Sequence, residues 1–193
     1  MASYYYFAAT LPSLSQWTPV PFSHAEFLER ASHFLKPADF ATLAAASLFV
    51  PDDGATPRPA ARLKLLTQYY RWERGLRNEL TRLRAARLQK PVEKHLKPGD
   101  IEWDALRVAQ AAFAADNPLE GELLIEKERW QTIERLSVNR YFNMDYLAAY
   151  ALKLQALLRR ERFKAAEGEA GYRIVYDSVL KSADYRNQTG DTK

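Results

Sequence analysis

The chain has 193 residues, no cysteine and a formal net charge of +4 at pH 7. The lack of cysteine excludes a disulfide framework, thiolate metal sites and cysteine catalysis. A chain of this length forms one domain, or two small ones with a shared core. It buries roughly 70% of the surface that its unfolded form exposes, so stability requires neither disulfides nor a metal ion.

The sequence contains no recognisable secretory signal or membrane span. No basic segment precedes the apolar residues at the start, and the longest low-charge run, residues 40–50, is far shorter than the ~20 residues of a spanning helix. We therefore expect a soluble protein that associates with a membrane only through a partner.

Positive charge is concentrated in the middle of the chain. The segment 58–90 contains ten basic residues against two acids, Glu73 and Glu79, which gives it a net charge of +8. From 116 to 134 the balance reverses, with six acids against two basic residues. We expect these two elements either to pair with each other or to face outside partners.

The N-terminal region begins with an aromatic run and continues into a capped helix. The run 4–12 fits a short strand or one or two helical turns, and its aromatic side chains are expected in the core. Ser23 and Glu26 form a capping box, because the serine can accept from the backbone three residues on while the glutamate reaches back. Phe27 and Phe34 belong to the apolar face of the helix that follows.

A second helix, a loop and a long basic helix come next. Pro37 suits the first position of a helix that extends to Phe49. The loop 51–59 is rich in proline and is the most natural hinge. A long helix then covers 60–89, in which Gly75 favours a close crossing with another helix. Its apolar stripe consists of Leu65, Tyr69, Trp72, Leu76, Leu80 and Leu83.

Two more helices are predicted between 100 and 137. Asp100 or Asp104 starts the first of them. Asn117 is a suitable N-cap for the second, with Pro118 at its first position and Glu120 reaching back. The buried face of this second helix is expected to contain Leu123, Trp130, Ile133 and Leu136.

The segment 143–163 is the most strongly patterned helix of the chain, and we expect the other helices to pack around it. Asn143 is a plausible N-cap and Asp145 lies at the positive end of the helix dipole. A last helix is expected to include 175–180, before a disordered tail at 187–193. The apolar stripe of the central helix contains Leu147, Tyr150, Ala151, Leu154, Leu157 and Leu158.

No strand alternation competes with these helices. We therefore predict an all-α fold, an irregular multi-helix bundle of about six or seven helices with one long basic helix. Residues 1–186 are expected to form a single domain.

Signatures of catalysis and of cofactor binding are missing from the sequence. Nucleotide-binding and serine-hydrolase motifs do not occur, and His24, His33 and His95 are not spaced as metal ligands, so we expect them at the surface or at helix caps. We predict no catalytic residue, no cofactor and no small-molecule substrate. Residues two apart on a helix do not share a face, so two carboxylate pairs are interpreted as solvated: Glu120 with Glu122, and Glu126 with Glu128.

The basic helix is the element with a functional interpretation. Its arginines, combined with Tyr69, Tyr70 and Trp72, could contact the phosphates and bases of a nucleic acid. These aromatics lie on or beside the predicted buried stripe, however, which removes the stacking contribution. A basic surface that meets an acidic protein is the preferred interpretation, nucleic-acid binding is the alternative, and a helical enzyme of unfamiliar type is the third.

Five segments, taken in order, carry a family resemblance. They are the aromatic opening 4–12; Leu76-Arg77-Asn78-Glu79-Leu80 followed by Leu83-Arg84 and Arg87-Leu88; Asn117-Pro118-Leu119-Glu120; Arg129-Trp130; and 141–155, Tyr-Phe-Asn-Met-Asp leading into Leu-Ala-Ala-Tyr-Ala-Leu-Lys-Leu-Gln. In these segments the chain resembles a bacterial protein family of unknown function that is encoded with V/A-type ATPases. More weakly, its aromatic start and Leu-Arg-Asn element resemble the helical central-stalk subunit of V-type ATPases, called C or d, which is a longer protein.

The resemblance implies a non-catalytic accessory, stalk-like or assembly subunit of an ion-translocating rotary ATPase, on the cytoplasmic side. Subunits of that ATPase are the implied partners. The resemblance also implies a cytoplasmic protein that lies at the periphery of the inner membrane only through that complex. The family offers no catalytic residue to carry over. The basic helix is therefore the expected partner interface, through Arg71, Arg74, Arg77, Asn78, Arg84 and Arg87.

Overall fold

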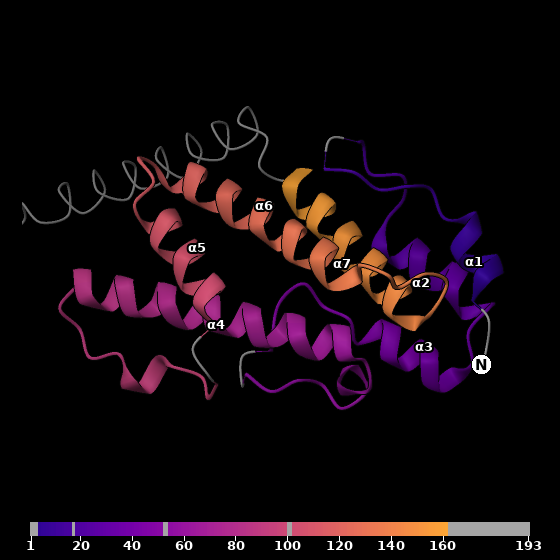
Figure 1. Cartoon of the computed structure of the whole chain (residues 1–193), viewed down its shortest axis with the longest axis horizontal. Helices are drawn as coiled ribbons and strands as arrows, with labels where there is room; N and C mark the ends of the chain where they lie inside the picture. Colours follow the sequence, from indigo (N-terminus) through magenta and orange to yellow (C-terminus); the bar gives the residue numbers. More distant parts are fainter. Residues whose placement is uncertain (1–3, 17, 52–53, 100–101, 162–193) are drawn as a thin grey trace, which may run out of the picture. The chain divides into compact units, whose positions relative to one another are not determined.

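A computed structural model describes residues 4–16, 18–51, 54–99 and 102–161. Every regular element in these residues is a helix (Figure 1), which confirms the predicted all-α multi-helix bundle. Residues 1–157 form one compact unit, and only 158–161 of the remaining residues are described. The predicted helix through 175–180 and the tail 187–193 lie outside the described residues, so the single domain 1–186 stays a prediction.

The aromatic run at the start forms a helix, α1 (Tyr5–Thr10). It does not enter the core as a whole, which corrects the prediction. Tyr4 and Phe7 are buried, but Tyr5 and Tyr6 are 57% and 69% exposed, because a helix this short turns only one of its sides toward the protein.

Two short helices follow, α2 (His24–Ser32) and α3 (Pro37–Ala44). The predicted cap of α2 is confirmed, since the Ser23 hydroxyl accepts from the backbone N–H of Glu26 at 3.1 Å. Phe34 comes after the end of α2 and is 47% exposed, so its predicted place on the buried face was wrong.

Helix α3 ends at Ala44, so the prediction that it extends to Phe49 was wrong. Beyond this point the backbone bonds distant side chains. The N–H of Ser47 donates to the Tyr70 hydroxyl at 2.9 Å, and the N–H of Leu48 donates to Oε1 of Gln155 at 3.0 Å. These bonds hold the segment 45–50 in a non-helical path against the rest of the bundle.

The long basic helix is α4 (Lys64–Arg87), preceded by the 3₁₀ turn η1 (Ala60–Arg62). The predicted helix from residue 60 is therefore interrupted at Leu63, whose backbone is extended. The N–H of Leu65, in the first turn, donates to Asp145 at 3.4 Å, so the acceptor comes from another helix. The predicted stripe is buried except for Leu83, which is half-buried.

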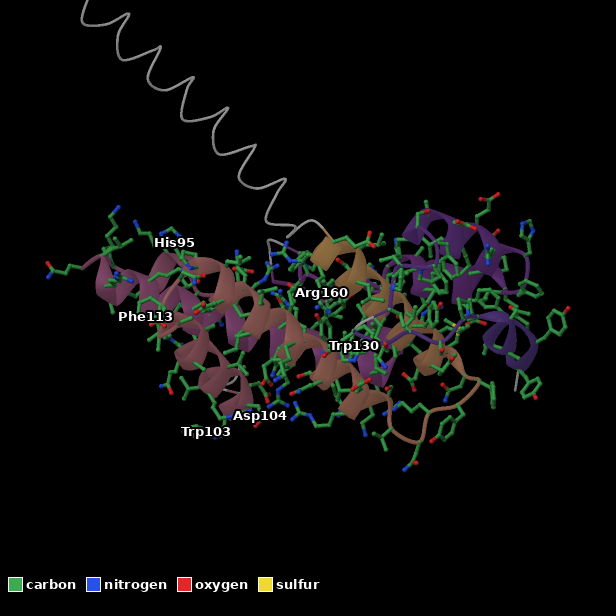
Figure 2. The ribbon with its side chains drawn as sticks, turned by 90° about the horizontal axis from the view of Figure 1, so that it is seen from above. His95, Trp103, Asp104, Phe113, Trp130 and Arg160 are labelled. Atoms are coloured by element: carbon green, nitrogen blue, oxygen red, sulfur yellow. The ribbon has the colours of Figure 1, made fainter. Side chains whose placement is uncertain are left out.

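A short 3₁₀ turn, η2 (Glu93–His95), leads to α5 (Trp103–Phe113). This helix begins one residue before Asp104, which corrects the predicted start; Asp100 lies outside the described residues. Asp104 pairs instead with Arg135 at 3.1 Å, beside the 75% exposed Trp103 (Figure 2).

Helix α6 (Pro118–Ser137) begins as predicted, because Asn117 Oδ1 accepts from the N–H of Glu120 at 2.9 Å. Helices α4, α5 and α6 pack against one another (Figure 1). A Cβ placed on Gly121 would lie 2.7 Å from the Ala112 carbonyl oxygen, so α5 and α6 touch there through their backbones. Leu123 is 39% exposed and does not belong to the buried face, contrary to expectation.

Helix α7 (Met144–Glu161) is the predicted central helix. Asn143 caps it by accepting from the N–H of Tyr146 at 2.9 Å. Its side chains reach several other elements: the Tyr150 hydroxyl donates to the carbonyl of Pro12 at 3.0 Å, and Lys153 lies 3.2 Å from Glu134 on α6. The helix is therefore a scaffold that joins the N-terminal segments to α4 and α6.

Candidate functional site

A buried ion-pair network lies where α4 meets α6. Arg129 of α6 donates from Nε and Nη2 to the two carboxylate oxygens of Glu73 on α4, at 2.9 and 2.7 Å. Its Nη1 donates to Glu126, one turn earlier, at 2.5 Å. Arg77 adds a 3.2 Å bond to the same Glu73 carboxylate. Glu73 is fully buried and Arg129 is 5% exposed, so this network fixes how the two helices pack.

The network reverses the charge pairing that the sequence suggested. The basic helix contributes the carboxylate of Glu73, and the acidic helix contributes the guanidinium of Arg129. Glu126 is 6% exposed, so its interpretation as a solvated residue was wrong; its position three residues before Arg129 turns it into the interior. Burial lowers the pKa of Arg129, but Glu73, Tyr69 and Glu126 together raise it by more, so the residue stays charged.

The segment after α3 covers this network through Phe49. The guanidinium carbons of Arg129 and Arg77 lie 4.9 and 5.0 Å from the centre of the Phe49 ring. Both contacts are within the range of cation–π attraction. Arg77, expected at a partner interface, thus takes part in a contact that joins α4, α6 and the segment 45–50.

Three other predicted interface residues also have contacts inside the chain. Arg71 pairs with Glu102, just before α5, and its side chain is 54% exposed. Arg74 donates to the carbonyl of Gly54 at 2.5 Å. Asn78 is 7% exposed and forms two bonds with the backbone of Lys97, at 2.8 and 2.9 Å. These contacts attach the loops 54–59 and 91–99 to α4.

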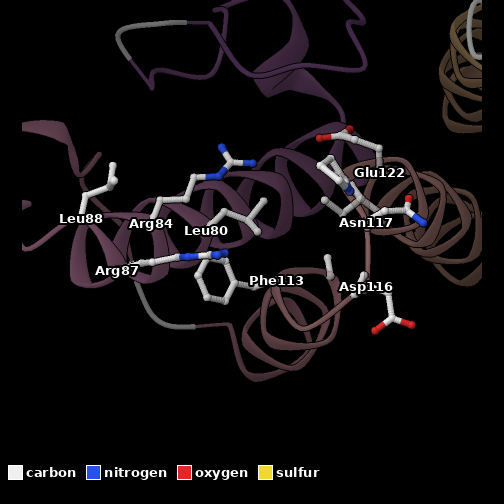
Figure 3. A pocket seen from close by; sticks show the side chains of 13 residues that line it. Leu80, Arg84, Arg87, Leu88, Phe113, Asp116, Asn117 and Glu122 are labelled. Atoms are coloured by element: carbon white, nitrogen blue, oxygen red, sulfur yellow. The ribbon is translucent and has the colours of Figure 1, made fainter. Parts of the chain in front are cut away.

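Arg84 and Arg87 have a different setting, on a groove of about 530 Å³ between the end of α4, the end of α5 and the start of α6. Leu80, Phe113 and Ile125 supply apolar lining, and Leu80 and Ile125 are buried. Both arginines are exposed and extend from α4 along the groove (Figure 3). The Arg87 guanidinium carbon lies 5.8 Å from the Phe113 ring centre. The groove therefore combines an apolar base with two arginines from α4 and two carboxylates, Asp116 and Glu122, near the start of α6.

The aromatic side chains of α4 are not displayed to solvent. Tyr69 and Tyr70 are fully buried and Trp72 is 5% exposed. The Tyr69 hydroxyl donates to the carbonyl of Leu48 at 2.9 Å. These rings cannot stack on the bases of a nucleic acid, in agreement with the sequence argument.

Sequence reasoning missed a polar cluster around Gln155 of α7. Its amide donates to the carbonyl of Ala46 at 2.8 Å and lies 3.2 Å from Nε2 of His24. Its oxygen accepts from Leu48. His24 is half-buried rather than at the surface, and burial lowers its pKa below the ordinary value of 6.5. Gln155 is the one glutamine in the largely apolar helix α7, and this was the signal in the sequence that could have revealed the cluster.

The described ranges contain no group of three or more His, Cys, Asp or Glu side chains that could hold a metal ion, and no helix long and apolar enough to cross a membrane. Comparison with protein-family models, curated proteins and solved structures gives no match. The fold defines a multi-helix bundle, and the functional argument therefore depends on the surface of α4.

Proposed function

We propose that this chain is a non-catalytic accessory, stalk-like or assembly subunit of a V/A-type ion-translocating ATPase, and that it acts through protein–protein contacts on the cytoplasmic side. The choice of an ATPase as the partner complex rests on the sequence resemblance. The observation in the structure that supports a contact function is the groove with Arg84 and Arg87 beside an apolar lining. Apolar burial beside the two arginines suits an amphipathic helix with acidic residues on the edge that faces α4.

The groove narrows the partner interface to two of the six predicted residues. Arg77 and Asn78 hold the fold together, and Arg71 and Arg74 have partners in neighbouring loops. Arg84 and Arg87 are exposed at the end of α4. A guanidinium that forms a bidentate pair with a partner carboxylate would give the contact its specificity.

Affinity purification tests this proposal. The tagged chain is recovered from native membranes after mild detergent extraction, and the proteins that accompany it are identified by mass spectrometry. We expect subunits of the rotary ATPase to be enriched over a tag-only control. Recovery of the chain without any ATPase subunit would contradict the proposed association.

Nucleic-acid binding is the alternative, and the net charge of +8 in the segment 58–90 favours it. With the α4 aromatics buried, such binding would depend on phosphate contacts and would weaken steeply with salt. Binding to duplex or single-stranded nucleic acid at low salt, with this salt dependence, would support the alternative. No binding at low salt would remove it.

A further inference from the structure

An exposed aromatic patch lies where α1 meets the end of α2 and the start of α7. It consists of Tyr5 and Tyr6 of α1, Phe34, which follows α2, and Phe142, which precedes α7. The ring centres of Tyr5 and Phe142 lie 4.5 Å apart, and those of Tyr6 and Phe34 lie 5.7 Å apart. Phe34 also stacks on the buried Phe7 at 5.2 Å. The patch therefore joins three segments that are far apart in the sequence.

The Phe142 ring is held at this surface by an unfavourable backbone conformation. Its φ is +55°, in the left-handed region that a bulky residue seldom adopts. Asn139, three residues earlier, has a φ of +59°, but asparagine tolerates this region. Asparagine at position 142 would likewise suit the path of the loop, so the backbone does not account for the phenylalanine. What Phe142 adds is its ring, which is 43% exposed in the patch.

The patch is large enough to form the core of a protein–protein interface. Its four residues are between 43% and 69% exposed. Because a large aromatic residue covers about 150–250 Å², together they expose roughly 300–550 Å². The largest apolar patch on a typical monomer measures about 300–600 Å² and is often functional. One side of a standard interface measures about 800 Å², with an apolar core inside a polar rim, so this patch supplies a core of suitable size.

We propose that this patch is the core of a two-fold contact between two copies of the chain. Its four side chains have no formal charge, and a tyrosine hydroxyl can both donate and accept, so two identical patches can meet without opposing like charges. Beside the patch, Arg140 pairs with Asp145 inside the chain. The exposed His33 and Lys36, which flank Phe34 in the sequence, would remain in the solvated rim. A second copy therefore suits the patch better than a strongly charged partner does.

Sedimentation equilibrium of the full chain tests the proposal. From low to high micromolar concentration, the average mass should rise from that of one 22.2 kDa chain toward that of two. We expect Tyr6→Glu/Phe142→Asn to weaken self-association at least tenfold. Asparagine suits the positive φ at 142 and Tyr6 is 69% exposed, so this variant should unfold in urea no more easily than the parent chain. A residue needed only for folding would not separate the two measurements in this way.

The matched control is Trp103→Glu/Leu119→Asn, which changes two residues of similar exposure, 75% and 44%, on α5 and α6. It should associate as the parent chain does. A mass of one chain at every concentration, or equal weakening by the control, would overturn the proposal. Loss of ATPase subunits with the patch variant of a monomeric chain would assign the patch to a different protein and overturn it as well. The four patch residues do not line the groove, so this proposal can fail while the proposed ATPase contact holds.

Discussion

Arg129 joins two buried carboxylates, so its side chain cannot be removed without leaving charge in the interior. We expect Arg129→Met to lower the free energy of unfolding by about 3–5 kcal/mol, the cost of an uncompensated buried charge. The measurement is urea denaturation followed by circular dichroism. In the triple variant Glu73→Met/Glu126→Met/Arg129→Met most of the loss should be recovered, because no charge remains buried. A loss below about 1 kcal/mol in Arg129→Met would mean that the network is not desolvated.

His24 gives the fold a dependence on pH. Its pKa is lowered by burial, so the unfolded chain binds a proton more readily than the folded one. The stability from neutral His24 is therefore present above pH 6.5 and is lost as the pH falls below that value. Protonation would also place an N–H of the imidazole against the Gln155 amide.

Unfolding free energies at pH values between about 7 and about 5 test this dependence. Carboxylates contribute to the same slope, so the parent chain is compared with His24→Gln, whose profile should be flatter over this range. His33→Gln removes an exposed histidine and should keep the parent slope. Identical slopes for the parent chain and His24→Gln would contradict the role assigned to His24.

The buried charges were not predicted from the sequence, although a signal was present. Arg129 lies four residues from both Ile125 and Ile133, and Glu73 lies four residues after Tyr69, so each charge falls within an apolar stripe. Because α4 is basic overall and α6 is acidic overall, the single opposite charge that each helix buries was not singled out. Their pairing depends on residues 56 apart in the chain, which no local pattern specifies.

At the scale of the helices, two glycines at crossings should respond oppositely to alanine. A Cβ on Gly121 meets the Ala112 carbonyl oxygen at 2.7 Å, and backbone cannot move away cheaply. A Cβ on Gly75 meets Cβ of Glu102 at 3.2 Å, where a side chain can shift. Alanine gains about 1 kcal/mol of helix propensity at either position.

We therefore expect Gly121→Ala to lower the unfolding free energy by up to about 2 kcal/mol after that gain, because overpacking costs about 1–3 kcal/mol. Gly75→Ala should be neutral or stabilising. Urea denaturation of both variants checks the difference, with each serving as the control for the other. A stabilised Gly121→Ala would show that α5 and α6 are further apart at this crossing.

Helix limits could be predicted where the capping group is local. Ser23, Asn117 and Asn143 each cap the helix that directly follows them, and each was identified from sequence. The end of α3 and the interruption before α4 could not be predicted, because Gln155 and Asp145 determine them from 107 and 80 residues away. Periodicity identified the helices of the described chain apart from α1, which the sequence left open between a strand and helical turns, while tertiary contacts set these two limits.

At the scale of the molecule, α7 is the scaffold and α4 carries the arginines of the groove. The predicted interface residues separate into three groups. Arg77 and Asn78 hold elements together through Glu73 and Lys97, Arg71 and Arg74 have partners in neighbouring loops, and Arg84 and Arg87 lie along the groove. The sequence directed the functional search to α4, and side-chain geometry then divided its residues in this way.

The central claim is that Arg84 and Arg87 contact an acidic segment of a rotary ATPase. The most direct measurement compares the ATPase subunits recovered from native membranes by the tagged parent chain, by Arg84→Glu/Arg87→Glu and by the control Arg62→Glu/Arg107→Glu. The control reverses two exposed arginines outside the groove. With folding verified by circular dichroism, we predict that recovery falls at least tenfold only when the groove is reversed. Undiminished recovery with the groove variant would contradict the claim.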